Sequence, residues 1–561
     1  MRLEYKWQAA IVTALGLFMA VLDNTIVSVA LPQMAKAFNT DLPTIAWVAT
    51  AYFLAQAAVI PVTGYLSDRI GTKTVFLTAL ALFTLGSGLC AIAPGKELLI
   101  AFRVIQGIGG GALFPMAFAI VFRVFPPTER GPASAIISVP VLLAPAFGPT
   151  IGGYLTTTFD WSAIFTVNLP FGVVALVLGF LVLRGRKAEN EASGEVQIEK
   201  KPFDVLGLAL AMLGFTALVY GISEAGTKGW GDMQVVIFLI AGAVLLIGFT
   251  ITELLVSDPV MDLRLFLNYT FTISNVLMWV LGAFLFGSLF LLPYFFENLQ
   301  GKTPLTAGET LISQGLAAAV AVAVGGRLYN RVGPRTLATI GLALITIGTY
   351  GFTQLDASTT GLALQPWLIV RGLGLGLTNL PLQTLALSVV SNRAMARASS
   401  LVNVTRQVFS AVGVAVLTSY LTQQINTHIN TVKTTFQGTP LKQAIQAAET
   451  AFMGQPLQQA KATCTAQLGQ TNPAGIPGCI QTAGQHYVQQ SVQQAAQHYF
   501  ALHAPNAAAM GFNDTFLLVL IVCGAAVMLA LFVGRDPAIE AAKRAKERGE
   551  TIEREPAVIS E

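Results

Sequence analysis

An acidic and a basic side chain lie inside long apolar stretches of this sequence, where charge is costly. Asp23 interrupts an apolar run over residues 8–30, and Arg103 lies five residues into another run over 98–121. At a rise of about 1.5 Å per helical residue, they lie about 12 Å and about 8 Å from the nearer ends of these runs, at comparable depth. Burial favours a protonated carboxyl, whereas a neighbouring arginine favours the carboxylate. The two residues predict either a permanent structural ion pair or a carboxyl that takes up and releases a proton.

Other polar side chains lie inside or at the ends of apolar runs. Glu309 lies near the start of one run, and Glu297 lies at the end of the run before it. For each of them three roles are open: a second proton site, a site for a cationic substrate, or a carboxylate that reaches interfacial water. Arg406 lies near the middle of a later run, where it would pair with Asp23, bind cavity polar groups or bind an anionic headgroup. The remaining candidates for a polar substrate cavity have amide or hydroxyl side chains: Asn24, Thr25, Asn168, Asn403 and Gln407.

The composition explains why these charges stand out. Of 561 residues, 54% are hydrophobic and 11% are charged, and the mean hydropathy is +0.65. A soluble protein has about 25% charged residues, so an ordinary soluble enzyme is excluded. Apolar runs of membrane-spanning length predict an all-α integral membrane protein with fourteen transmembrane helices. The runs lie near 8–30, 44–66, 74–93, 98–121, 134–156, 161–183, 203–222, 234–255, 269–296, 306–324, 336–354, 366–388, 399–421 and 512–533.

The distribution of basic residues predicts the orientation. With the N-terminus inside, the inner segments hold 23 Lys and Arg, the outer segments seven and the spans three. The positive-inside rule therefore predicts a multi-pass protein of the plasma (inner) membrane with both termini in the cytoplasm. The expected segments are an N-terminal six-helix bundle (1–187), a cytoplasmic loop (188–202), two inserted spans (203–256), C-terminal spans 9–13 (257–421), an extracytoplasmic helical hairpin (422–510), span 14 (511–534) and a cytoplasmic tail (535–561).

Two short segments repeat each other in register. GYLSDRIGTK at 64–73 follows the second run and GRLYNRVGPR at 326–335 follows the tenth, at an offset of 262 residues. Arg103 and Arg371 likewise lie five residues into the fourth and twelfth runs. Two similar six-span halves, with spans 7 and 8 inserted between them, explain this offset. Parallel repeats of this kind place a substrate site between the halves at mid-membrane.

The whole chain resembles the fourteen-span drug:proton antiporters of the major facilitator superfamily, the EmrB/QacA group. The matching stretches are LDNTIVSVALP at 22–32, GYLSDRIGTK at 64–73, RVIQGIGGG at 103–111, GPTIGG at 148–153, IFTVNLPFG at 164–172 and VMDLRLF at 260–266. The resemblance implies the major facilitator fold, two six-helix bundles plus two inserted spans. It also implies that the span-1 carboxylate, Asp23, couples transport to protons together with Arg103, and Glu309 is a further candidate.

The resemblance also implies two mechanical motifs. The loop after span 2 latches one half to the other in the outward-facing state, and its residues here are Gly64, Asp68, Arg69 and Gly71, with Arg331 in the second copy. Helix capping and the positive-inside pattern are compatible with the same residues. The span-5 motif is associated with antiport, and its glycines also let helices approach closely. Its residues here are Gly148, Pro149, Gly152 and Gly153.

The expected function is proton-coupled export of lipophilic compounds. Three arginines but two carboxylates, Asp23 and Glu309, lie clearly inside the spans, so neutral, monocationic or amphiphilic substrates are favoured over dications. Export of a lipid, an endogenous metabolite or a home-made antibiotic on the same scaffold is the alternative. A membrane-embedded enzyme is a remote one, because every histidine falls in the 422–510 segment and no GxSxG is present.

The expected partners are small lipophilic substrates, protons and membrane lipid. A periplasmic adaptor stays open for a cell with an outer membrane. No cofactor, metal or nucleic acid is expected, because no Cys/His ligand cluster is present and the net charge is only +4.

Two cysteines fall in the predicted outer hairpin. Cys464 and Cys479 flank a stretch rich in helix breakers, TAQLGQTNPAGIPG, so the chain can turn and bring its ends together. An oxidising exterior permits a disulfide between them. Two unpaired thiols in a polar loop are the alternative.

Overall fold

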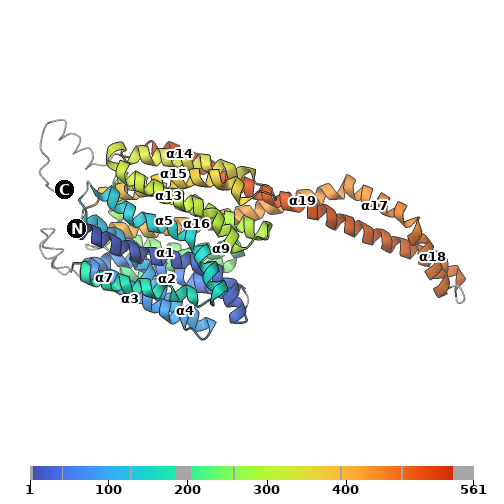
Figure 1. Cartoon of the computed structure of the whole chain (residues 1–561), viewed down its shortest axis with the longest axis horizontal. Helices are drawn as coiled ribbons and strands as arrows, with labels where there is room; N and C mark the ends of the chain where they lie inside the picture. The colour runs from blue at the N-terminus through green and yellow to red at the C-terminus, as the bar shows by residue number, and fades with distance from the viewer. Residues whose placement is uncertain are drawn as a thin grey trace. The chain divides into compact units, whose positions relative to one another are not determined.

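The computed structural model describes residues 4–40, 42–126, 129–184, 204–256, 259–391, 394–468 and 472–534, and every regular element in these ranges is a helix (Figure 1). The expected cytoplasmic loop 188–202 and tail 535–561 lie outside the described residues. The chain forms two compact units. The first takes the described residues within Met1–Phe352, Thr360–Ser419 and Phe516–Glu561, and the second takes those within Thr353–Thr359 and Tyr420–Thr515.

The helices follow the predicted runs closely. The first seven are α1 (Tyr5–Ala37), α2 (Leu42–Ile70), α3 (Thr72–Ala91), α4 (Lys96–Val124), α5 (Arg130–Thr158), α6 (Ala163–Thr166) and α7 (Asn168–Val182). The inserted pair is α9 (Val205–Lys228) and α10 (Met233–Leu255). Then come η2 (Leu263–Leu267), α11 (Tyr269–Val280), η3 (Leu281–Phe286), α12 (Gly287–Tyr294), η4 (Phe295–Leu299), α13 (Pro304–Val332), α14 (Pro334–Tyr350), η5 (Gly351–Gln354), α15 (Gly361–Ser388), α16 (Met395–Gln437), α17 (Thr439–Phe452), α18 (Gln455–Leu468), η7 (Pro473–Gly475) and α19 (Ile476–Ala530).

Eleven helices among the described residues are long and apolar enough to cross a membrane, judged by length and composition. The chain is therefore a multi-pass membrane protein. The other three predicted runs fall on α5, on the segment from α11 to η4 and on α15. In α15 the polar residues Arg371, Asn379 and Gln383 lower the hydropathy. The segment from α11 to η4 changes three times between α-helix and π-helix. Eleven of the fourteen predicted membrane-spanning helices are thus supported directly.

Glycines in α4 bring three helices of the first unit together. A Cβ at Gly107 would lie 2.6 Å from the carbonyl oxygen of Tyr52 in α2, and one at Gly109 would overlap the carbonyl of Ala79 in α3. Small residues allow such backbone approach in membrane helices. The glycine-rich stretch after Arg103 therefore serves helix packing, and it brings the Arg103 segment of α4 against α2 and α3.

The two copies of the repeat fold alike. Gly71 ends α2 with φ 92° and Gly333 ends α13 with φ 88°, a conformation that favours glycine. A Cβ at Gly64 of α2 would lie 2.7 Å from the carbonyl oxygen of Ala396 in α16. In the second copy, a Cβ at Gly326 of α13 would lie 3.0 Å from the carbonyl oxygen of Gly131 in α5. The second helix of each half thus packs closely against the fifth helix of the other half.

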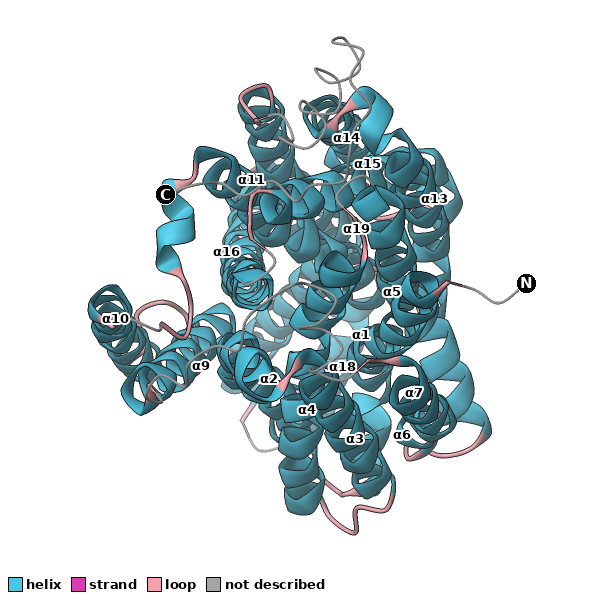
Figure 2. Ribbon diagram, turned by 90° about the vertical axis from the view of Figure 1, so that its left-hand side faces the viewer, coloured by secondary structure: helices cyan, strands magenta, loops and turns pink. Residues whose placement is uncertain are grey.

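The inserted pair lies at one edge of the first unit. Figure 2 shows α9 between α10 and α2, and both contacts are extensive. The rings of Trp47 in α2 and Tyr220 in α9 lie 5.9 Å apart. The inserted pair is therefore fastened to the N-terminal half through α2.

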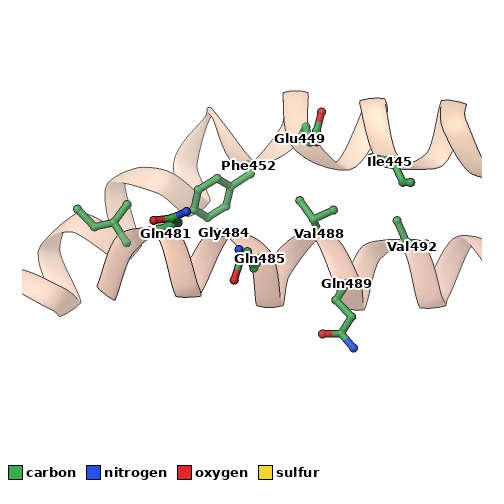
Figure 3. A pocket seen from close by; sticks show the side chains of 10 residues that line it. Ile445, Glu449, Phe452, Gln481, Gly484, Gln485, Val488, Gln489 and Val492 are labelled. Atoms are coloured by element: carbon green, nitrogen blue, oxygen red, sulfur yellow. The ribbon is translucent and has the colours of Figure 1, made fainter. Parts of the chain in front are cut away.

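The second unit is a helical hairpin, built from the last turns of α16, from α17 and α18, and from the first part of α19. A shallow groove between α17 and α19 is lined by Ile445, Glu449, Phe452, Gly484 and Val488, among others (Figure 3). The sequence predicted helix breaking throughout TNPAGIPG, and this is wrong for its last three residues, Ile476–Gly478, which start α19. Proline is tolerated in the first turn of a helix, where its missing N–H costs no hydrogen bond.

A disulfide joins Cys464 at the end of α18 to Cys479 at the start of α19. Closing a loop of about 15 residues stabilises a fold by about 3 kcal/mol in the chain-entropy model. The free cysteines, Cys90 and Cys523, are buried.

We therefore expect two alkylatable thiols in the denatured, unreduced protein and four after reduction, counted by intact mass. The Cys464→Ser/Cys479→Ser variant should show faster hydrogen exchange in α18 and unchanged exchange in α4. Four alkylatable thiols before reduction would contradict the disulfide. The Cys90→Ala/Cys523→Ala variant is the control, because before reduction it should show no alkylatable thiol.

Candidate functional site

The Asp23 and Arg103 side chains meet in the interior of the N-terminal half. Nη1 of Arg103 in α4 donates to Oδ2 of Asp23 in α1 at 2.5 Å, and the two side chains are 1% and 0% exposed. The predicted pairing of these charges is therefore what the structure shows. Such a buried pair depends on further hydrogen bonds, because two charges out of water lose several kcal/mol of solvation each.

Two amides complete the carboxylate's coordination. Oδ1 of Asp23 accepts from Nε2 of Gln106 at 2.9 Å and from Nδ2 of Asn168 at 3.0 Å. Asn168 is the first residue of α7 and also donates to Oγ of Ser87 at 3.1 Å, which in turn donates to the carbonyl of Phe165. We call these residues, with Arg103, the Asp23 network. It joins α1, α3, α4 and α7.

Arg103 keeps other partners besides the carboxylate. Its Nε donates to the carbonyl of Val48 at 3.0 Å and its Nη1 to Oε1 of Gln106 at 2.7 Å. Its guanidinium also lies 4.0 Å from the centre of the Tyr52 ring, within cation–π range. The buried arginine therefore has a carbonyl oxygen, an amide oxygen and an aromatic ring as partners in addition to the carboxylate.

The predicted span-5 motif packs beside this network. A Cβ at Gly148 of α5 would overlap the side chain of Thr25, two residues after Asp23, and one at Gly152 would lie 3.2 Å from the carbonyl oxygen of Ile26. Gly153 faces elsewhere: a Cβ there would lie 3.8 Å from Cδ1 of Leu305 in α13. The side chain of Pro149 lies outside the described part of the structure. Thus α5 contacts α1 through one pair of glycines and the other half through the next residue.

The predicted latch contains a carboxylate between two arginines. Oδ1 of Asp68 in α2 accepts from Nη2 of Arg123 in α4 at 3.0 Å, and Oδ2 accepts from Nε of Arg397 in α16 at 2.8 Å. We call Asp68, Arg123 and Arg397 the latch. Arg397 belongs to the other half, and Ser399 and Ser400 near it donate to the carbonyls of Pro115 and Ile60. These contacts join the N-terminal and C-terminal halves at the end of α2 where the latch lies.

The other predicted latch residues are placed differently. The guanidinium of Arg69 lies 4.8 Å from the Tyr65 ring centre, next to the latch. Arg331, in the second copy of the repeat, is exposed at the end of α13. The second copy also has Asn330 where the first has Asp68.

The structure brings together only part of the predicted substrate cavity. Nη2 of Arg406 donates to Oδ1 of Asn403 at 3.1 Å, and its guanidinium lies 4.6 Å from the ring centre of Phe114 in the other half. Oδ1 of Asn24 is buried without a hydrogen-bond partner among the described residues. The hydroxyl of Thr25 donates to the carbonyl of Leu22 in its own helix. Gln407 is half-buried.

The two remaining carboxylates lie apart from the Asp23 network. Glu309 is exposed in the second turn of α13, and Glu297 is half-buried in η4. Among the described residues no three His, Cys, Asp or Glu side chains gather as metal ligands would.

Comparison with known proteins identifies the family of this chain. The family model of the Major Facilitator Superfamily matches residues 13–414. The chain belongs to this superfamily. It is 37% identical over 420 residues to a "Multidrug resistance protein B homolog" of Mycobacterium tuberculosis, covering 74% of this chain and 76% of that protein. It is 32% identical over 421 residues to the "Multidrug export protein EmrB" of Escherichia coli, covering 74% and 80%.

A solved structure shares the fold of this chain. The proton:xylose symporter XylE aligns over 96% of this chain and 99% of its own, with a TM-score of 0.55 and 12% identity. The resemblance to the EmrB/QacA group is confirmed by the relatives named above. The match to the family model ends at residue 414, before the long segment of the second unit, Tyr420–Thr515.

Sequence reasoning missed four residues of these sites: Ser87, Gln106, Arg123 and Arg397. Gln106 follows Arg103 by three residues, one helical turn, so it shares its helix face and could have been found from that spacing. Arg123 and Arg397 were counted only as inner basic residues. No short-range spacing relates Arg397 to Asp68, which lies 329 residues earlier in the chain.

The two faces of α5 give a matched pair of substitutions. We expect Gly148→Ala to lower the efflux rate at least tenfold, because its methyl group would overlap Thr25 beside Asp23. Gly153→Ala should leave efflux within about twofold and the unfolding temperature unchanged or higher, because alanine favours a helix over glycine by about 1 kcal/mol. Equal losses in both variants would contradict this division of the motif.

Proposed function

We propose that the protein exports lipophilic compounds across the plasma membrane by alternating access, driven by proton entry through Asp23. The supporting observation is the Asp23 network, a carboxylate at 0% exposure on a helix that also packs against the span-5 glycines. The names of the relatives, which are multidrug export and resistance proteins, support the substrate class. The protein is accordingly a transporter rather than an enzyme.

The proposed coupling uses the relative movement of α1 and α4. While Arg103 is bonded to Asp23 the carboxylate is favoured, and if α1 shifts against α4 the isolated, buried carboxyl favours a proton. Arg103 would then rely on Val48, Gln106 and the Tyr52 ring. Because α5 packs on α1 at Thr25 and also along α13, rocking of the C-terminal half would act on the helix that carries Asp23.

The proposed orientation follows from the positive-inside rule. Both termini and the latch then face the cytoplasm, and the second unit with its disulfide lies outside. With the latch joined, the described conformation has the two halves closed at the cytoplasmic side.

A proton gradient supplies enough energy for this cycle. One charge crossing 100 mV releases about 2.3 kcal/mol, and one pH unit adds about 1.4 kcal/mol. Together they support a gradient of several hundredfold for a neutral substrate at one proton per cycle.

The decisive test replaces Asp23 by Asn in proteoliposomes. Asn imitates the protonated carboxyl, so Asp23→Asn should abolish efflux driven by a pH gradient while substrate exchange down a gradient continues. Asp232→Asn, a change at the N-cap of α10, is the control and should leave driven efflux intact. Driven efflux at the wild-type rate in Asp23→Asn would show that the coupling site lies elsewhere.

Arg406 offers a test of the substrate class. Its guanidinium lies between the halves over Phe114, so it should disfavour cationic substrates there. Arg406→Gln should raise the efflux of a monocationic dye relative to a neutral lipophilic compound by about threefold to tenfold, whereas Arg406→Lys should keep the wild-type ratio. The same loss for both compounds in Arg406→Gln would indicate a structural role.

A further inference from the structure

A buried carboxylate near the latch has no part in the cycle proposed above. Glu253 lies in the last turn of α10 and is 2% exposed. Its Oε1 accepts from the backbone N–H of Val260 at 3.1 Å, and its Oε2 accepts from that of Met261 at 3.2 Å. These two residues begin the VMDLRLF stretch, which links the inserted pair to the C-terminal half. Glu253 thus holds the start of this linker with both of its carboxylate oxygens.

The linker in turn contacts the latch arginine. Nη1 of Arg397 donates to the carbonyl oxygen of Pro259 at 2.7 Å, while its Nε donates to Asp68 at 2.8 Å. Pro259 directly precedes the two residues that Glu253 binds. The bonds of Glu253 therefore orient the carbonyl that orients Arg397 toward Asp68.

The other end of the inserted pair is fastened to the opposite half. The backbone N–H of Asp204, the N-cap of α9, donates to the hydroxyl of Tyr65 at 3.1 Å, and Tyr65 is fully buried in α2. The ring of Tyr65 also lies 5.5 Å from the guanidinium of Arg397. The pair α9–α10 thus begins at α2 of the N-terminal half and ends at the linker that holds Arg397.

We propose that the inserted pair α9–α10 is a second fastening of the latch, and that Glu253 is its positioning residue, acting through Pro259 and Arg397. When the halves separate at this end, Arg397 must leave Asp68. An arginine already oriented by Pro259 loses less freedom on binding Asp68, so the joined state is favoured. The inference rests on the alternating-access part of the proposed function and on no property of the Asp23 network.

The test measures the conformation directly. Spin labels are placed at Ile70→Cys and Val332→Cys, which are 44% and 40% exposed and occupy matching positions at the ends of α2 and α13. Distances are recorded by electron paramagnetic resonance on the full chain in lipid nanodiscs, without substrate or gradient. A glutamine at position 253 turns an N–H toward one of the two backbone donors. Glu253→Gln should therefore lower the ratio of short to long distances about fivefold, the typical effect of one lost hydrogen bond.

Two controls separate positioning from general stability. Glu224→Gln removes a carboxylate of α9 that pairs with Lys228, away from the latch, and should leave the distances unchanged. In an Arg397→Gln background, Glu253→Gln should add no further shift. Tyr65→Phe removes only the oxygen that accepts the hydrogen bond from Asp204, and it should shift the ratio in the same direction. This variant replaces Glu253→Gln in the test if Glu253→Gln does not fold.

The proposal is overturned if Glu253→Gln lowers the unfolding temperature with unchanged distances, or if it shifts them equally with and without Arg397. Neither result depends on proton coupling, so a failure of the Asp23→Asn prediction and a failure here can be told apart.

Discussion

The ion pair between Asp23 and Arg103 is the constraint around which the N-terminal half is arranged. Removing one partner of such a buried pair typically costs about 3–5 kcal/mol, and the pair itself is stable only when further hydrogen bonds satisfy both side chains. Gln106 serves both, because its amide nitrogen donates to Asp23 and its oxygen accepts from Arg103. Val48 can reach Arg103 only because α4 approaches α2 closely, and Gly107 permits that approach. The glycine-rich stretch thus follows from the need to solvate a charge with protein groups.

The two halves share a backbone plan but differ in charge. Gly71 and Gly333 turn the chain identically, and α2 meets α16 much as α13 meets α5. Only the first copy has the acid, Asp68, whereas the second has Asn330. A contact made by charge breaks and re-forms with little rearrangement of packing. The contact between α2 and α16 therefore includes an ion pair that can break and re-form, whereas the contact between α13 and α5 depends on close packing.

Periodicity and depth were enough to predict the helices and the meeting of Asp23 with Arg103, because both charges lie at similar depths in spans that must pack together. The cysteine spacing likewise predicted a disulfide as one of two alternatives. Helix faces were harder to predict. An apolar run does not show which side of its first turns meets a neighbour, so the sequence could not tell that Glu309 is exposed near the start of α13. Its role in proton coupling stays a prediction. Arg397 lies 329 residues from Asp68, and nothing local to either residue indicates the contact.

Helix α5 is held in place mainly by close packing against its neighbours. Gly148 and Gly152 bring it against Thr25 and Ile26 of α1, beside Asp23, and Gly131 brings it against the backbone of Gly326 in α13 of the other half. Such contacts transmit movement because close-packed surfaces do not compress. The polar contacts lie elsewhere, in the latch and in the Asp23 network, where a bond can be exchanged for another. In the proposed cycle, α5 therefore connects the helix that carries Asp23 to α13 of the other half, so a movement of α13 acts on the Asp23 network.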